Sequence, residues 1–112
     1  MRVKYYLKSS GRSPVEDFLQ TVSQEIRFDF FDAINQLAEG KNLSMPLNRN
    51  LSSIHHGLHE LRFKDRAGPV RIFYVIVSRD AIYILHAFQK KTQQLPKKEL
   101  AVVLNRIKEV KK

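Results

Sequence analysis

The sequence of 112 residues contains no cysteine, which excludes disulfide bonds, cysteine-ligated zinc sites and thiol nucleophiles. It also lacks any run of about 20 apolar residues, the length that a membrane-spanning helix requires. Residues 1–8 are too mixed in character to form the apolar core of a signal peptide. We therefore expect a soluble cytoplasmic protein with no membrane partner.

Linkers, internal repeats and low-complexity segments are also absent. The chain has only four glycines and four prolines, and they are scattered as single turn signals. With 43% hydrophobic residues, the chain has the length and the apolar content of one domain with one core. We therefore expect a single domain over residues 1–112.

The motifs of common cofactor and metal sites are missing as well. The sequence has no glycine-rich phosphate loop, no HExxH motif and no nucleophile elbow. The nearest approach to a metal site is His55, His56 and His59, but adjacent side chains of a strand point to opposite faces. We therefore expect no bound metal and no cofactor.

Acidic residues are few, because 11 Asp and Glu stand against 20 Lys and Arg, a net charge of +9. The excess is concentrated in the second half. Residues 1–57 have a net charge of +1, whereas residues 58–112 have a net charge of +8. A basic surface of this kind favours a polyanionic partner, either a nucleic acid or an acidic protein, and charge alone does not distinguish the two.

The first half of the chain has the pattern of one strand and two helices. Residues 1–7 alternate apolar and polar side chains, as a strand does. Residues 13–16 (SPVE) form a helix-capping signal. Over residues 15–38 apolar side chains recur at three- and four-residue steps. A second capping signal at residues 21–24 indicates a helical hairpin, which we expect to end at Gly40.

The second half has the pattern of three strands and a helix. We expect an irregular connection over residues 41–57, a strand from Leu58 to Phe63, further strands at residues 70–77 and 81–88, and a helix that begins at Pro96. This order predicts an α+β two-layer fold with an antiparallel β-meander. Because both N-terminal helices can cover one face of the sheet, we expect the other face to be open and basic.

Basic residues of the predicted strands are the main candidates for a binding site. Strand alternation places Glu60, Arg62 and Lys64 on one face. Arg71 interrupts the most apolar strand, where burial of a guanidinium group is costly unless an anion meets it. Two interpretations remain open: an ion pair with Glu60 or Asp65, or a phosphate site that uses the bidentate fork of the guanidinium group.

The end of the last predicted strand offers a second group of candidates. Alternation places His86 on the same face as Ile84 and Phe88. His86 is either a structural histidine or a catalytic one. Phe88 is followed by Lys90 and Lys91, so an aromatic ring for stacking on a base lies beside two cations for its phosphates.

Three segments carry a resemblance to a known toxin family. They are residues 57–62 (GLHELR), 71–74 (RIFY) and 84–93 (ILHAFQKKTQ), with Pro96 after them. Together they resemble the phage-derived Gp49-like, HigB branch of the RelE toxin superfamily over nearly the whole chain. The resemblance implies a RelE-like fold and the toxin of a type II toxin–antitoxin system. It further implies an endoribonuclease that enters the ribosome and cuts mRNA during translation.

The resemblance also implies roles for individual residues. RNA carries its own 2′-hydroxyl nucleophile, so the enzyme has only to align it, move two protons and stabilise charge on the phosphate, without a metal. By position, Arg62 and Arg71 resemble the arginines that hold the scissile phosphate. Lys90 or Lys91 resembles the basic residue after the strand, and His86 is a candidate acid or base. The expected RNA contacts are Lys64, Phe88 and His59. The implied partners are mRNA on the ribosome and a cognate antitoxin of the helix-turn-helix type.

Two other functions fit the same charge pattern. The chain is alternatively a non-catalytic nucleic-acid-binding module, or an interaction protein with an acidic partner. A catalytic toxin would lose toxicity on a single substitution while it still binds, whereas in an interaction protein substitution of Arg62 or Arg71 would weaken only the complex. A fold alone does not decide between these functions.

Overall fold

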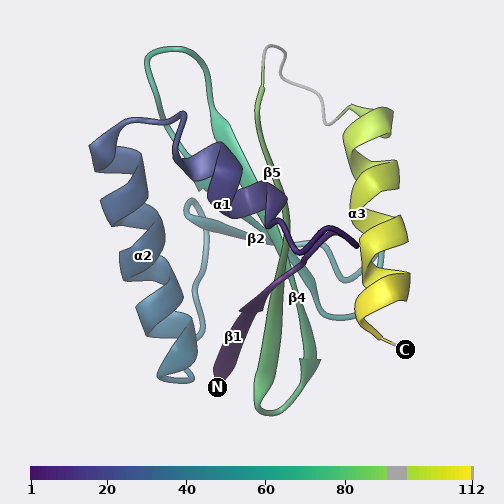
Figure 1. Cartoon of the computed structure of the whole chain (residues 1–112). Coiled ribbons are helices and arrows are strands. Elements are labelled where there is room, and N and C mark those ends of the chain that lie inside the picture. The colour runs from purple at the N-terminus through teal and green to yellow at the C-terminus, as the bar shows by residue number, and fades with distance from the viewer. Residues whose placement is uncertain (91–95, 112) are drawn as a thin grey trace.

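The computed structural model describes residues 1–90 and 96–111 of the chain, so that Lys91, a predicted catalytic residue, lies outside the described residues. Figure 1 shows the order of the elements. In the described residues these are β1 (Arg2–Tyr5), α1 (Pro14–Leu19), α2 (Gln24–Ala38), β2 (Asn48–Asn50), β3 (Leu58–Phe63), β4 (Val70–Ser78), β5 (Ala81–Gln89) and α3 (Lys97–Val110).

The strands form a mixed sheet with the order β1-β5-β4-β3-β2. The predicted meander of β3, β4 and β5 is confirmed, since both of its pairings are antiparallel. β1 pairs with β5 in parallel and forms one edge of the sheet. β2 pairs with β3 and forms the other edge, within residues 41–57, which were expected to be irregular. The prediction was wrong here because the segment Asn48–Asn50 (NRN) has no strand pattern of its own, and its pairing with β3 makes it a strand.

The two N-terminal helices begin at the predicted capping signals. Ser13 Oγ accepts a hydrogen bond from the amide of Glu16, and Ser23 Oγ accepts one from the amide of Ile26. These contacts satisfy backbone donors that the first turn of a helix leaves unpaired. The helical hairpin is therefore confirmed, with Ser23 as the N-cap of its second helix.

Both faces of the sheet are covered by helices, as Figure 1 shows. On one face, α1 and α2 bury residues such as Phe30 and Ile34 against Ile72 of β4. On the opposite face, α3 buries Val103 and Ile107 in a second core. The strand residues of that second core include Leu58, Phe73, Val75 and Leu85. The α+β class is confirmed, but the expectation of a wholly open second face was wrong, because the apolar side of α3 covers part of it.

No helix within residues 1–90 and 96–111 combines the length and the apolar content that crossing a membrane requires.

Candidate active site

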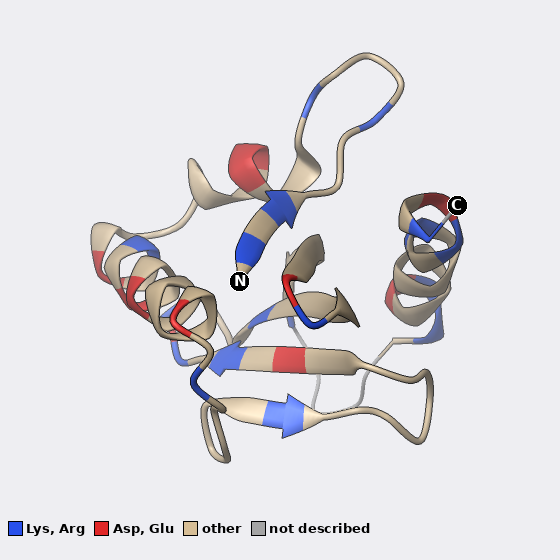
Figure 2. Ribbon diagram, turned by 90° about the horizontal axis from the view of Figure 1, so that it is seen from below, with Lys and Arg blue, Asp and Glu red and all other residues tan. Residues whose placement is uncertain are grey.

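Four basic residues gather around one carboxylate on the face of the sheet that carries α3. We call this group the basic cluster; it consists of Arg49, Arg62, Arg71, Lys90 and Glu60. The strand register brings its members together, because Arg49 lies opposite Glu60 and Arg62 lies opposite Arg71. Lys90 directly follows β5, and its amide donates to the carbonyl of Pro69 at the start of β4. Figure 2 shows the basic positions on neighbouring strands and acidic positions on α2.

Two glycines allow the backbone to come close enough for this arrangement. Gly57, just before β3, has a φ of 79°, and a Cβ there would lie 2.5 Å from the carbonyl oxygen of Ile76. Gly68, in the turn before β4, has a φ of 125°, and a Cβ there would lie 2.5 Å from the carbonyl oxygen of Lys90. Only glycine fits these positions without strain. They therefore fix where Arg62 and Lys90 lie relative to β4.

Glu60 lies between the two central arginines. Its Oε1 is 3.8 Å from Arg62 Nε, and its Oε2 is 3.7 Å from Arg71 Nε. Both distances exceed a normal hydrogen bond. The Glu60 side chain is 4% exposed and that of Arg71 is 9% exposed. Glu60 therefore neutralises part of the charge of the two arginines while leaving their Nε–H groups unpaired.

The Nε atoms of both arginines are buried, and the described residues offer them no hydrogen-bond partner. Arg71 Nη1 donates to the carbonyl of Val70 at 3.2 Å, and Arg62 Nη1 lies 3.9 Å from Met45 Sδ, a weak acceptor. Buried donors without a partner are uncommon in folded proteins. Such a pair of guanidinium groups is suited to an oxyanion that accepts from both.

Burial also changes the protonation equilibria of the cluster. The pKa of Arg71 is lowered mainly by burial. The negative charge of Glu60 raises it in part, and the positive charge of Arg62 lowers it further. Burial likewise lowers the pKa of Lys90, and the neighbouring charge of Arg71 lowers it further. Arg71 keeps its charge because an arginine is not deprotonated in proteins. The lysine ammonium becomes a stronger acid than one in water.

A bulge in β5 decides the position of His86. Phe73 pairs with His86, but the next residue of β4 pairs with Ile84, so Leu85 is an extra residue in β5. The expectation that His86 shares a face with Ile84 was therefore wrong, since simple alternation does not continue through a bulge. The expectation that it shares a face with Phe88 is confirmed, with the two ring centroids 5.8 Å apart.

Both ring nitrogens of His86 are engaged by α3. The Nε2 atom pairs with the carboxylate of Glu99, and Nδ1 lies 3.2 Å from Arg106 Nη1. A guanidinium group only donates, so Nδ1 accepts and Nε2 carries the proton that is donated to Glu99. Burial is the main cause that lowers the pKa of His86, and Glu99 opposes it. His86 is thus a neutral imidazole that links α3 to the sheet.

The remaining predicted residues lie in different places. Phe88 stacks on Phe73 with ring centroids 5.9 Å apart, on the face of the basic cluster. Lys64 is exposed and directly follows β3. His59 points to the other face, where its ring stacks on Tyr74 at 5.0 Å. The structure therefore does not bring His59 into the basic cluster.

The position of His59 explains how the edge strand is held. Its Nδ1 lies 3.1 Å from Asn48 Nδ2, and the Tyr74 hydroxyl donates to Asn48 Oδ1 at 2.6 Å. Burial lowers the pKa of His59 and raises that of Tyr74. These contacts fix β2 against β3 and so place Arg49 beside Glu60. Among the described residues, no cluster of histidine and acidic side chains suits a metal ion, and His55 and His56 form none with His59.

Sequence reasoning missed three residues of this region. Arg49 was missed because its strand is created by pairing with β3. Glu99 and Arg106 were missed because the partners of His86 depend on how α3 docks. One signal was present, since these two residues are seven positions apart and therefore lie on the same side of a helix.

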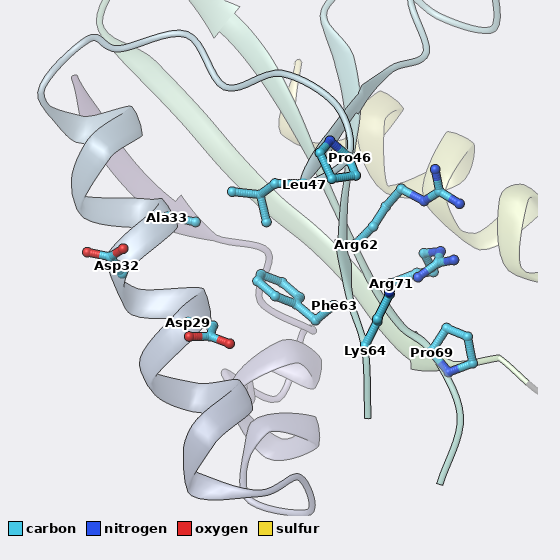
Figure 3. A pocket seen from close by; sticks show the side chains of 10 residues that line it. All are labelled: Asp29, Asp32, Ala33, Pro46, Leu47, Arg62, Phe63, Lys64, Pro69 and Arg71. Carbon is cyan, nitrogen blue, oxygen red and sulfur yellow. The ribbon is translucent and has the colours of Figure 1, made fainter. Parts of the chain in front are cut away.

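A pocket of about 490 Å³ adjoins the basic cluster. Figure 3 shows Asp29 and Asp32 of α2 on one side, and Arg62 and Arg71 extending from the strands on the other. The other residues that line it are Ala33, Pro46, Leu47, Phe63, Lys64 and Pro69. In the same view the guanidinium groups of Arg62 and Arg71 point away from α2, so the pocket has acidic side chains on α2 and mainly apolar side chains opposite them.

Comparison with known proteins adds one finding. The family described as phage-derived protein Gp49-like matches residues 17–108, which include α2, β2, the meander and most of α3. The matched range contains the whole basic cluster, His86 and both helical partners of His86. A comparison with curated proteins found no match.

Proposed function

The chain belongs to the Gp49-like family of phage-derived proteins, a family of RelE-type toxins, and from this we propose that it is a ribosome-dependent mRNA endoribonuclease of the HigB branch. The α+β fold with an N-terminal strand, a mixed sheet and a C-terminal helix is the RelE-like fold. Family membership also indicates a cognate antitoxin. We propose that the antitoxin is of the helix-turn-helix type and that both proteins act in the cytoplasm.

The observation that carries the proposal is the pair Arg62 and Arg71 beside Glu60. A phosphodiester group that entered the cluster would offer two oxygens to the unpaired Nε–H groups, which Glu60 approaches only to 3.7 and 3.8 Å. Charge-assisted contacts of guanidinium to phosphate are among the strongest hydrogen bonds in proteins. Four cations around one carboxylate leave a net positive charge for this purpose.

The reaction proposed for this site needs no external nucleophile. The 2′-oxygen of the RNA attacks the adjacent phosphorus while the bond from phosphorus to the 5′-oxygen breaks, which leaves a 2′,3′-cyclic phosphate and a 5′-hydroxyl end. One proton leaves the 2′-hydroxyl and another reaches the 5′-oxygen. Arg62 and Arg71 stabilise the extra negative charge on the phosphate in the transition state. Lys90, whose pKa burial lowers, is our candidate for the group that protonates the 5′-oxygen.

The other predicted residues take supporting roles in this proposal. Phe88 supplies a ring on which a base stacks, and exposed Lys64 contacts a neighbouring phosphate. His86 acts as acid or base only after it exchanges Glu99 or Arg106 for the RNA, because both nitrogens are engaged. Lys91 remains a candidate from the sequence. His59 would contact only RNA that passes around the β2 edge.

The test is expression of the chain with and without its antitoxin, combined with cleavage of a defined mRNA on purified ribosomes. We expect growth arrest without the antitoxin, cleavage only when ribosomes are present, and 2′,3′-cyclic phosphate ends on the products. Soluble protein that binds ribosomes but leaves the mRNA intact would instead support the non-catalytic binding module. Efficient cutting of free mRNA would contradict dependence on the ribosome.

A further inference from the structure

The arginine of the edge strand β2 is the member of the basic cluster whose role is still open. Arg49 is exposed, and it lies on the α3 face of the sheet because it is directly opposite Glu60. The two carboxylate oxygens of Glu60 approach Arg62 and Arg71 instead. Among the described residues, the Arg49 side chain has no hydrogen bond and no ion pair. Its guanidinium group is therefore able to bind an external anion.

The register of the sheet places other candidate side chains in a line that leads toward this arginine. Arg62 pairs with Arg71, and Arg71 pairs with Phe88, so the line runs across β3, β4 and β5. Arg49 lies one strand beyond Arg62, opposite the residue two positions before it. Strands are about 4.8 Å apart and rise about 3.4 Å per residue, so the Cα atoms of Arg62 and Arg49 are about 8 Å apart. A single strand of RNA that lies along this line therefore passes over the β2 edge.

The distribution of charge favours this direction for a strand of RNA. The guanidinium groups of Arg62 and Arg71 point away from α2, as Figure 3 shows, so the acidic residues of α2 do not face a phosphate held there. On the α3 face, α3 covers the part of the sheet around His86, where Glu99 adds a negative charge. The edge strand Asn48–Asn50 (NRN) has no acidic residue. Phosphates are therefore attracted to the β2 edge and repelled by the carboxylate on α3.

A second observation shows that the charge of Arg49 acts within the cluster. Burial is the main cause that lowers the pKa of Lys90, the charge of Arg71 is the next, and the charge of Arg49 adds to the decrease. Lys90 follows β5, which is three strands away from β2. The guanidinium group of Arg49 therefore extends toward the cluster. A guanidinium group in this position can donate two parallel hydrogen bonds to a phosphate.

We propose that Arg49 binds the RNA phosphate next to the scissile one, on the side away from the base that stacks on Phe88. Its role is to fix the position of the strand on the sheet, since a contact with phosphate does not read the base. That this strand is a cleaved mRNA rests on the proposed function. The site itself makes a separate claim, which is that the free protein gains affinity from a second phosphate only when Arg49 is present.

The experiment compares two uridine oligonucleotides with 2′-O-methyl groups, which remove the nucleophile and so prevent cleavage. The dinucleotide UpU has one phosphate, and the trinucleotide UpUpU has two. Calorimetry or NMR titration of the wild type should show about fivefold tighter binding of the trinucleotide, the gain that one exposed ion pair supplies. Arg49→Ala should reduce this gain to about twofold or less. Arg49→Lys should restore part of it, because lysine keeps the charge but loses the bidentate fork.

The salt dependence of binding gives a second readout. The slope of log Kd against log salt concentration for the trinucleotide should decrease by about 0.7 in Arg49→Ala, which is the contribution of one phosphate contact to a single strand. Arg79→Ala is the matched control, since it removes an equal charge from the exposed turn between β4 and β5, and it should keep the full gain. Lys64→Ala tests the other exposed cation beside the arginine pair. Melting curves of these variants should coincide with wild type, because all three positions are exposed.

The outcomes separate this inference from the proposed function. A gain that Arg49→Ala removes supports the second phosphate site, even if no cleavage of mRNA is found. Equal affinity of the wild type for both oligonucleotides, or a gain that Arg49→Ala leaves unchanged, overturns the inference even if the chain cuts mRNA on ribosomes. If only Lys64→Ala removes the gain, the second phosphate lies at the end of β3 and the inference is wrong. A gain that Arg79→Ala also removes is an effect of net charge and overturns it as well.

Discussion

Replacing Arg71 by alanine removes a side chain that belongs to the proposed phosphate site and is also buried in the fold. Its guanidinium group lies 3.7 Å from Glu60 and offers an unpaired Nε–H to a phosphate. The residue is also only 7% exposed, so its loss leaves Glu60 buried with one arginine fewer. A loss of cleavage could therefore arise from lost phosphate binding or from lost stability, and the experiment must distinguish the two.

The two contributions have different magnitudes. Loss of one hydrogen-bond donor to the negative charge of a transition state raises the activation free energy by about 3–4 kcal/mol, which lowers the rate roughly a hundredfold to a thousandfold. Loss of a partner for the buried carboxylate costs about 1–3 kcal/mol of unfolding free energy. For a chain of this length, that corresponds to a decrease of roughly 4–15 °C in Tm. We expect Arg71→Ala to remain folded at 25 °C and to be inactive.

The double variant Glu60→Gln, Arg71→Ala separates these contributions. Without the carboxylate, the loss of Arg71 leaves no buried anion short of a partner, so part of the Tm should return while cleavage stays absent; Glu60→Gln alone measures what Arg62 loses with its acidic neighbour. Arg71→Lys should recover part of the activity, because lysine keeps the charge but loses the bidentate fork. Arg79→Ala removes an equal charge from an exposed turn and should cleave normally.

The assays are thermal melting and ribosome-dependent cleavage on the same preparations. The reasoning is refuted if cleavage returns together with Tm in the double variant. Arg71 would then be a structural partner of Glu60, and the phosphate would be held elsewhere.

Three further predictions follow from other parts of the structure. Burial lowers the pKa of His86 below its unfolded value of about 6.5, so the unfolded chain takes up a proton at a higher pH than the folded chain does. The unfolding free energy should therefore decrease as the pH drops below about 7 and become constant below the pKa of His86 in the folded chain. Urea titrations across this pH range should show a smaller decrease for His86→Gln, and an unchanged decrease would contradict the assignment. Gly57→Ala should lower Tm and cleavage more than Gly11→Ala does. Both glycines have a positive φ, but a Cβ at Gly57 would lie 2.5 Å from the Ile76 carbonyl oxygen, whereas a Cβ at Gly11 would have no atom within 4 Å. Equal melting temperatures would show that the close approach is unimportant. The association rate with the antitoxin should decrease as salt increases, because the chain has a net charge of +9, and stopped-flow rates that do not depend on salt would exclude electrostatic steering.

The elements that the sequence predicted correctly are those whose signals are local. Ser13 and Ser23 cap helices through contacts within three residues, and the apolar runs of β4 and β5 need a buried sheet whatever their neighbours are. The shared face of Glu60 and Arg62 followed from alternation along one strand, whereas the register that adds Arg71 to it came from the structure.

What the sequence did not predict depends on contacts between distant segments. Arg49 joins the basic cluster only because β2 pairs with β3, and the three-residue strand has no pattern to indicate it. The covering of the second face depends on where α3 docks against the sheet. The engagement of His86 by Glu99 and Arg106 follows from that docking. None of these contacts is encoded in a short stretch of residues.

The extra residue in β5 has a further consequence for the composition of the basic cluster. Before Leu85, the even-numbered side chains of β5, such as Ile84, face α1 and α2, whereas after the bulge Ala87 faces them and Phe88 faces α3. Phe88, and with it Lys90 two positions later, therefore reach the arginines only because the strand changes phase at this point. A strand of the same length without the bulge would alternate regularly from Ile84 onward and would turn the stacking ring and the lysine to the opposite face. The irregularity of β5 is thus as much a part of the site as the identity of any residue in it.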